Sequence, residues 1–207
     1  MILSNMMFLI NYETLVDPYL RDVRKFTLEF SGMKAGDKVI DVCCGTGAQV
    51  LEYASQGIIA TGIDNNPTML KIATRNNVRQ ARDVSFQLAN ATKLPFPNGY
   101  FDYASISLAL HDKSKPDRFA IISEMKRVIK GSGALILIDF PISLPRNVWG
   151  MSVRAIELLA GRTNYRSFKD YLANGGLDDV LMNHGLREEC RTTIKRGLLV
   201  AMKAVKN

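Results

Sequence analysis

The sequence contains little cysteine and has no long apolar run. Its 207 residues include three cysteines, two histidines and one tryptophan. Three cysteines are too few for a disulfide framework, and neither C-x2-C nor H-x3-H, the spacings of zinc sites, occurs. No apolar run approaches the roughly 18–20 residues that span a bilayer. We therefore expect no disulfide scaffold, no metal site and no membrane span, and we expect a cytoplasmic protein.

The chain also lacks a block of basic residues, although its net charge is +7. A positive charge of this size would suit nucleic acid or an acidic substrate. The lysines and arginines are instead spread along the chain in runs of at most two. This scatter is typical of a solvated basic surface, so nucleic acid is not the partner that we expect.

Short β-rich runs alternate with helical stretches through most of the sequence. Apolar strands that alternate with helices predict a parallel sheet covered on both faces. Two last β-rich runs, separated by "KRG", predict an antiparallel hairpin. The expected fold is α/β, a Rossmann-like doubly wound sheet, mostly parallel, with an antiparallel C-terminal edge hairpin. We expect strands at 38–43, 59–63, 84–88, 101–107, 134–140, 187–194 and 198–205, and helices at 48–55, 67–80, 117–129, 147–160, 168–173 and 177–184.

The stretch "VIDVCCGTG" places two adjacent cysteines between an apolar run and a glycine turn. A glycine-rich turn after a first strand brings backbone close to a nucleotide. Val50 stands where a dinucleotide fingerprint needs its third glycine, which disfavours a dinucleotide oxidoreductase. Asp41 would repel a pyrophosphate and attract a cationic ligand. We interpret Cys43 and Cys44 as small residues at a strand end, with a thiol site for metal or redox chemistry as the alternative.

A second acid ends the second strand. Asp64 could accept hydrogen bonds from both hydroxyls of a ribose. Alternatively, it caps the helix that begins near Pro67. Together with the first turn, it favours a nucleoside that carries an ammonium or sulfonium group.

Four motifs in register carry a resemblance to a known family. "VIDVCCGTG", "TGIDNNPTML", "ANATKLPFPNGYFDYASISLALHD" and "EMKRVIKGSGALILIDF" resemble a class I S-adenosylmethionine-dependent methyltransferase. Within that superfamily the chain is similar to the methyltransferase type 11 branch, which includes quinone C-methyltransferases. The resemblance covers residues 10–140 and implies methyl transfer from S-adenosylmethionine to an O, N or C nucleophile of a small molecule, with S-adenosylhomocysteine as product.

The resemblance also implies which residues bind the cofactor. Asp41, with the turn that follows it, would hold the methionine part, and Cys43 replaces the family's first glycine. Asp64 would bind the ribose hydroxyls. Asn90 stands where the family usually has an aspartate that accepts from the adenine amino group. The implied cofactor residues are Tyr12, Asp41, Cys43, Gly45, Thr46, Gly47, Asp64, Asn65, Asn66, Met69, Asn90, Ala91, Thr92 and Ser107.

The acceptor side is less clearly marked in the sequence. His111, just past the fourth strand, is our candidate for a general base, and ordering of its loop is the alternative. Asp112 either orients the histidine ring or lies in solvent. Tyr165 and Arg166 lie in the helical insertion where this branch often builds its substrate pocket. We expect one domain, with a lid or helical segment at 1–35, a cofactor-binding core at 36–140, an insertion near the substrate at 141–185 and a strand hairpin at 186–207.

Other functions stay open from the sequence alone. An RNA or protein methyltransferase is suggested by the charge, but "ISLALHD" follows the fourth strand where base-amine methylating enzymes carry Asn/Asp-Pro-Pro-aromatic. A cofactor-binding protein without catalysis is suggested by Asn90 and Cys43. Quinone C-methyltransferases tend to show S-x-G-L-R-N after strand four, and Ala109 and His111 depart from that pattern. The sequence leaves the oligomeric state open between monomer and homodimer.

Overall fold

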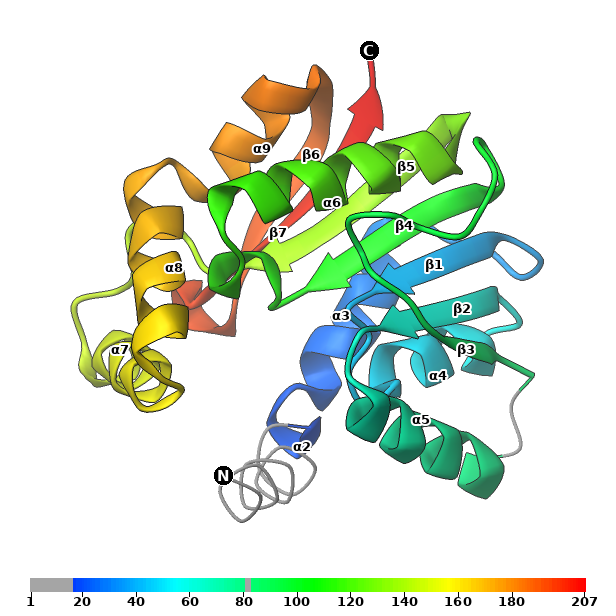
Figure 1. The fold of residues 1–207 in the computed structure, drawn as a ribbon, viewed down its shortest axis with the longest axis horizontal. Coiled ribbons are helices and arrows are strands. Elements are labelled where there is room, and N and C mark those ends of the chain that lie inside the picture. Colours follow the sequence, from blue (N-terminus) through cyan, green and yellow to red (C-terminus); the bar gives the residue numbers. More distant parts are fainter. Residues whose placement is uncertain (1–16, 81–82) are drawn as a thin grey trace.

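The computed structural model describes residues 17–80 and 83–207. They form a seven-stranded sheet with the strand order β3-β2-β1-β4-β5-β7-β6. Helices cover both faces of this sheet (Figure 1). The strands are β1 (Lys38–Val42), β2 (Ile59–Asp64), β3 (Ser85–Leu88), β4 (Phe101–Ser107), β5 (Ile129–Asp139), β6 (Leu186–Ile194) and β7 (Leu199–Lys206).

The helices come between the strands, as the sequence predicts, and in one block before the hairpin. They are α2 (Asp17–Tyr19), α3 (Arg21–Ser31), α4 (Ala48–Ser55), α5 (Pro67–Gln80), the 3-10 turn η2 (Leu110–Asp112), α6 (Lys115–Val128), α7 (Val148–Leu159), α8 (Arg162–Ala173), α9 (Gly176–His184) and the 3-10 turn η3 (Lys195–Gly197).

The pairing of the strands confirms the predicted fold class. β1 pairs in parallel with β2 and β4, β2 with β3, and β4 with β5. β7 pairs antiparallel with both β5 and β6. The carboxyl ends of the parallel strands therefore share one edge, and α7 and α8 stand beside that edge (Figure 1). Ligands of open α/β sheets bind at such an edge.

The largest apolar cluster lies between the sheet and the helices α6, α8 and α9, which cover one of its faces. The amphipathic pattern of the helix expected at 117–129 puts Phe119, Ile122, Met125 and Ile129 on one face. Ile122 and Met125 are buried, but the prediction for Phe119 was wrong, since it is 51% exposed, and Ile129, although buried, begins β5. The helix instead turns Arg118 inward, where its guanidinium donates to the carbonyl of Lys113 at 2.7 Å and to Asp170.

Helices α3, α4 and α5 cover the opposite face of the sheet (Figure 1). Val50 and Tyr53 of α4 are fully buried against Val39 and Ala60 of the sheet. Burial of a large apolar side chain contributes about 1.5–3 kcal/mol, so this layer holds the first turn of α4 in place against β1 and β2.

Helix α9 ends as the sequence predicts. Gly185 adopts the left-handed conformation with φ +55°, and its N–H donates to Leu181. The two ring nitrogens of His184 lie 2.8 Å from the carbonyl oxygen of Val180 and 3.0 Å from that of Phe119. His184 is therefore a helix-end residue, as its position before glycine indicates.

Two boundaries differ from the sequence prediction by five or six residues, for local reasons. β5 begins at Ile129 rather than at 134, because Ile129 already pairs with Phe101. The residues "KGSG" then form an irregularity in the register before Ala134 pairs with Tyr103. α8 begins at Arg162 rather than at 168, directly after Gly161, whose φ is +121°.

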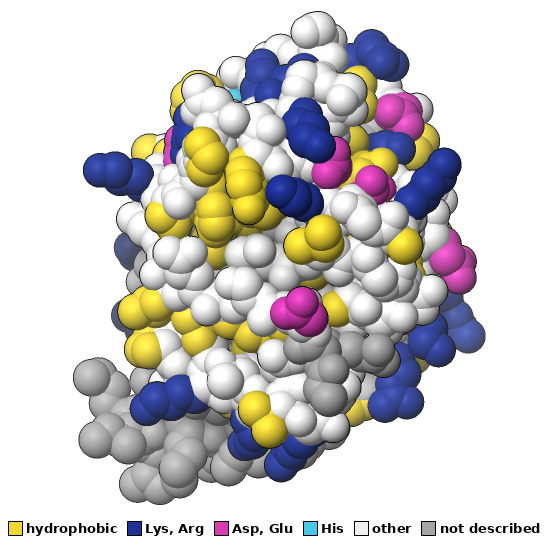
Figure 2. All heavy atoms as spheres, turned by 90° about the vertical axis from the view of Figure 1, so that its right-hand side faces the viewer, with side chains coloured by type: hydrophobic (Ala, Val, Ile, Leu, Met, Phe, Trp, Pro, Cys, Tyr) yellow, Lys and Arg dark blue, Asp and Glu magenta, His cyan; other side chains and the backbone are white. Residues whose placement is uncertain are grey.

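The face of the molecule at the amino ends of the parallel strands carries mixed charges. Figure 2 shows lysine and arginine side chains scattered over this face among acidic and apolar ones. No helix in the described part of the chain is both long and apolar enough to cross a membrane.

The turn into α4 yields a test of this packing. Gly47 has φ +73°, and a Cβ there would lie 2.5 Å from the ring of Phe86 and 2.8 Å from Cβ of Ala73. We expect Gly47→Ala to lower the free energy of unfolding by about 2–4 kcal/mol, from left-handed strain and overpacking together. Urea unfolding measures the change.

Gly131→Ala is the matched control, because a Cβ at Gly131 would meet no atom within 4 Å. If both alanine variants change the free energy of unfolding equally, the packing described around Gly47 is wrong.

Candidate functional site

Asp41 lies within β1 and is 4% exposed. Its Oδ1 accepts a hydrogen bond of 2.6 Å from the hydroxyl of Ser105 on β4. Burial raises the pKa of Asp41 to about 7, and the negative charge of Asp64 adds to the rise, while the hydrogen bond from Ser105 opposes it. Such a carboxyl is only partly ionised at neutral pH, and a nearby cation would favour its charged form.

Asp64 joins the loops that follow β1 and β2. Its Oδ2 accepts from the N–H of Gly45 at 2.9 Å, and its Oδ1 accepts from the N–H of Asn66 at 2.8 Å. The second bond holds Asn66 in place before α5. The side chain of Asn66, and not that of Asp64, caps the helix, because its Oδ1 accepts from the N–H groups of Thr68 at 2.9 Å and Met69 at 3.4 Å. Each carboxylate oxygen has a further acceptor direction. Two vicinal hydroxyls therefore fit Asp64 without displacing either backbone donor.

The glycine turn itself leaves room for a ligand. Gly45 has φ +53°, and a Cβ there would meet no atom within 4 Å. The N–H of Gly47 donates to the carbonyl of Cys44 at 3.0 Å and closes the turn. The backbone at Gly45 thus faces open space next to Asp64, which suits the close approach of a ligand.

The two cysteines pack on opposite sides of the sheet. Cys43 packs against the cluster below α6, and Cys44 packs against the cluster below α4. Cys43 has φ +60°, a conformation that favours glycine, which explains why the related family has glycine there. Burial raises the pKa of Cys43 to about 12 and also raises that of Cys44. Among the described residues no group of three His, Cys, Asp or Glu side chains could hold a metal ion.

The loops after β3 and β4 complete this edge of the sheet. The N–H of Ala89 donates to the carbonyl of Asp64 at 3.1 Å, which places the following Asn90 beside β2. Oδ1 of Asn90 accepts from the backbone and hydroxyl of Thr92, both at 2.9 Å. Asn65 is exposed, Met69 and Ser107 are half-buried, and Ala91 is buried.

One contact of the turn was not predicted from the sequence. The hydroxyl of Thr46 donates to Oδ2 of Asp17 at 2.8 Å, and Arg24 pairs with the same carboxylate. The segment before β1 therefore touches the turn directly. Tyr12, the expected lid residue, lies outside the described residues.

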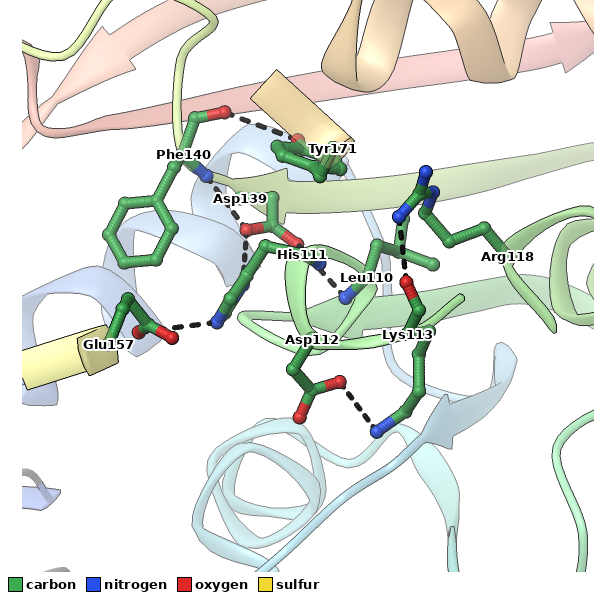
Figure 3. Close-up of polar contacts among 9 residues, drawn as sticks. All are labelled: Leu110, His111, Asp112, Lys113, Arg118, Asp139, Phe140, Glu157 and Tyr171. Carbon is green, nitrogen blue, oxygen red and sulfur yellow. Dashed lines mark hydrogen bonds and ion pairs between the residues drawn. The ribbon is translucent and has the colours of Figure 1, made fainter. Parts of the chain in front are cut away.

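A buried cluster of charged groups lies beyond β4 (Figure 3). Nδ1 of His111 is 2.7 Å from Oδ1 of Asp139, and its Nε2 is 3.5 Å from Oε1 of Glu157 on α7. Asp139 is fully buried, and its carboxylate also accepts from the N–H groups of Leu110, His111 and Phe140. Asp139 thus clamps the loop after β4 to the end of β5, which supports the loop-ordering role considered for His111.

The cluster is both aromatic and charged. The ring centroid of His111 lies 4.7 Å from that of Phe140 and 6.0 Å from that of Phe168. Burial of the ring works to lower the pKa of His111, but the two carboxylates outweigh it and raise the pKa to about 10. In this arrangement His111 carries its proton at neutral pH. Glu157, which sequence reasoning missed, is the second carboxylate at this ring.

The remaining candidates lie around this cluster. Asp112 is half-buried and pairs with Lys113 at 2.6 Å rather than with the ring of His111. Tyr165 is half-buried, and its ring lies 6.4 Å from that of Phe168, one ring further from His111. Arg166 is exposed. Cys43 packs against the apolar cluster that contains Ala109 and Leu110, so the histidine loop borders the glycine turn.

Comparisons with known proteins show what this chain is similar to. The family profile described as "Methyltransferase domain" matches residues 39–133. A demethylmenaquinone methyltransferase of Listeria welshimeri is 33% identical over 157 residues, which cover 72% of this chain and 65% of that protein. The chain is therefore similar to S-adenosylmethionine-dependent methyltransferases, and in particular to the quinone methyltransferases among them.

Solved structures share the fold. An S-adenosylmethionine-dependent methyltransferase from Aquifex aeolicus has a TM-score of 0.67 at 19% identity, covering 87% of this chain and 88% of that chain. A geranyl diphosphate C-methyltransferase from Streptomyces coelicolor, solved with S-adenosylhomocysteine, has a TM-score of 0.64 at 14% identity, covering 90% and 80%. The match to the Listeria protein spans less than two thirds of that protein's length.

The burial of the two adjacent cysteines predicts a labelling order. With iodoacetamide at pH 8, we expect Cys190, which is exposed, to react first. Cys43 and Cys44 should stay protected in the folded protein, because burial keeps both thiols protonated. Mass spectrometry of digests measures the order of labelling. Fast labelling of Cys43 would contradict this prediction and favour the alternative of a thiol site for metal or redox chemistry.

The pairing of His111 predicts a pH dependence of stability. Its folded pKa of about 10 lies above the unfolded value near 6.5, so its contribution is complete below about pH 6.5 and is lost as the pH rises through 10. His111→Gln should remove this part of the pH profile, which is on the order of 5 kcal/mol. Urea unfolding between pH 6 and 10 tests this, and parallel profiles for the two proteins would refute it.

Proposed function

We propose that this protein transfers the methyl group of S-adenosylmethionine to a small-molecule acceptor. The observation that carries the proposal is the pair of acids at the ends of adjacent strands, Asp41 and Asp64, on either side of an open glycine turn. One acid suits a cation and the other suits vicinal hydroxyls. S-adenosylmethionine carries both groups on one nucleoside.

Each part of the cofactor has a candidate residue. Asp64 would accept from the ribose hydroxyls, and Asp41 would meet the positive amino group, directly or through water. Asn90 would accept from the adenine amino group in place of the Thr92 hydroxyl, which holds one of the two lone pairs of its Oδ1. The bound cofactor supplies an electrophilic methyl on a sulfonium. The chain has only to align the acceptor with it, and such alignment avoids several kcal/mol of entropic cost.

The acceptor side favours a hydroxylated aromatic molecule. The protonated ring of His111 offers a positive charge among Phe140, Phe168 and Tyr171. This combination suits a flat apolar body whose oxygen becomes negative as it reacts. The acceptor's proton would pass to Glu157, the methyl group would bond to the acceptor, and the sulfonium would become the neutral thioether of S-adenosylhomocysteine.

The curated relatives support this acceptor class. The Listeria relative is named for demethylmenaquinone, whose reduced form is a hydroxylated aromatic ring. Tyr165 lies next to Phe168 and would extend the pocket, while exposed Arg166 would act only at its rim. We infer one domain, with the divisions 1–35, 36–140, 141–185 and 186–207, that works in the cytoplasm without nucleic acid.

The cofactor assignment is tested by calorimetry. The wild type should bind S-adenosylhomocysteine in the micromolar range and should not bind NAD. Asp64→Ala should weaken binding at least about a hundredfold, because it removes two hydrogen bonds to a charged acceptor. Arg166→Ala, at an exposed residue far from Asp41 in the chain, serves as the control.

Absence of binding by the wild type would overturn the proposal. Binding without transfer to any of a panel of hydroxyaryl compounds, followed with a labelled methyl donor, would favour the alternative of a cofactor-binding protein without catalysis.

A further inference from the structure

Helix α7 presents its apolar side chains to solvent. Its exposed residues include Leu159 at 86%, Val148 at 70%, Met151 at 66% and Ile156 at 61%. Leu158 and Trp149 are exposed at 55% and 48%. Large exposed apolar patches on a folded protein mark sites of interaction.

The inward side of the same helix fixes its orientation. Gly150 and Glu157 are its buried residues, and Glu157 reaches the ring of His111 (Figure 3). Gly150 lies so close to Pro145 that a Cβ would be 1.9 Å from the Pro145 carbonyl oxygen. The side chain of Asn147 caps the helix by accepting from the N–H groups of Trp149 and Gly150, both at 3.1 Å. The contacts of Glu157, Gly150 and Asn147 therefore fix the rotation of α7, and they leave its apolar side chains facing solvent.

The charge around this face has one sign. In residues 140–169 the only acid is Glu157, which is buried and paired with His111. The same segment exposes five cations, and none of them makes an ion pair or a hydrogen bond with the described residues. They are Arg146, Arg154, Arg162, Arg166 and Lys169.

We propose that this face of α7 docks the protein onto an anionic phospholipid bilayer. An apolar helix face with arginines beside it matches the chemistry of such a surface, which offers acyl chains below a layer of negative headgroups. Trp149 belongs to the residue type that settles at the boundary between the two. A second copy of this chain fits less well, since a twofold contact would bring the arginines together without an exposed acid from this segment to pair with them.

Docking by this face would bring the acceptor side of the site to the bilayer surface, because Glu157 and the exposed apolar residues share one helix. The docking itself does not depend on the proposed reaction, so its test needs no cofactor and no acceptor.

Vesicle binding tests the inference, and Trp149, the single tryptophan of the chain, reports it. The full chain is mixed with phosphatidylcholine vesicles with or without phosphatidylglycerol. We expect co-sedimentation and a blue shift of tryptophan emission with the anionic vesicles, and weaker binding at high salt. The double variant Met151→Glu, Leu159→Glu should bind about tenfold less or weaker still. Arg154→Gln and Arg162→Gln should each weaken binding about fivefold.

The control is the double variant Val78→Glu, Met182→Glu. These side chains are 76% and 75% exposed on α5 and α9, so the control changes charge and apolarity equally away from α7. Circular dichroism checks the folding of each variant. No binding by the wild type, or equal loss in both double variants, would overturn the inference. A blue shift that grows with protein concentration without vesicles would overturn it in favour of a second copy.

Discussion

Three buried carboxylates lie where the parallel strands end, and the structure depends on the hydrogen bonds that each of them accepts. Burying an ionised carboxyl is expensive unless donors or cations compensate it. Asp139 receives three backbone N–H groups and the ring of His111. Asp64 receives two backbone N–H groups. Asp41 receives one hydroxyl, from Ser105, within the described part of the chain.

The number of hydrogen-bond donors that each carboxylate receives distinguishes the structural acid from the acids that can bind a ligand. Asp139 is fully satisfied, so it can hold the loop after β4 and fix the charge of His111. Asp64 is satisfied but keeps acceptor directions for a ligand. Asp41 is buried with a single hydrogen-bond donor, and burial raises its pKa to about 7. A cationic ligand would complete its environment, which is why the cofactor proposal rests on this edge of the sheet and not on the fold alone.

The sequence predicted what local patterns encode. The strand and helix order, the glycine turn, Asp41, Asp64 and the helix end at His184 all follow from short motifs, and the structure has them in place. The prediction for Phe119 was wrong because tertiary contacts with Lys113 and Asp170 turn Arg118 inward. Glu157 and Asp17 could not be predicted, because their contacts with His111 and Thr46 join segments that are distant in the chain.

We propose that Asp41 is partly protonated in the free protein and loses its proton when the cation of the cofactor binds beside it. Calorimetry of S-adenosylhomocysteine binding at pH 7, repeated in buffers of different ionisation heat, measures the protons released. With a pKa of about 7 in the free protein, binding should release about half a proton from Asp41. In Asp41→Asn that release should disappear. Binding to the wild type without proton release, or equal release by the variant, would contradict the account.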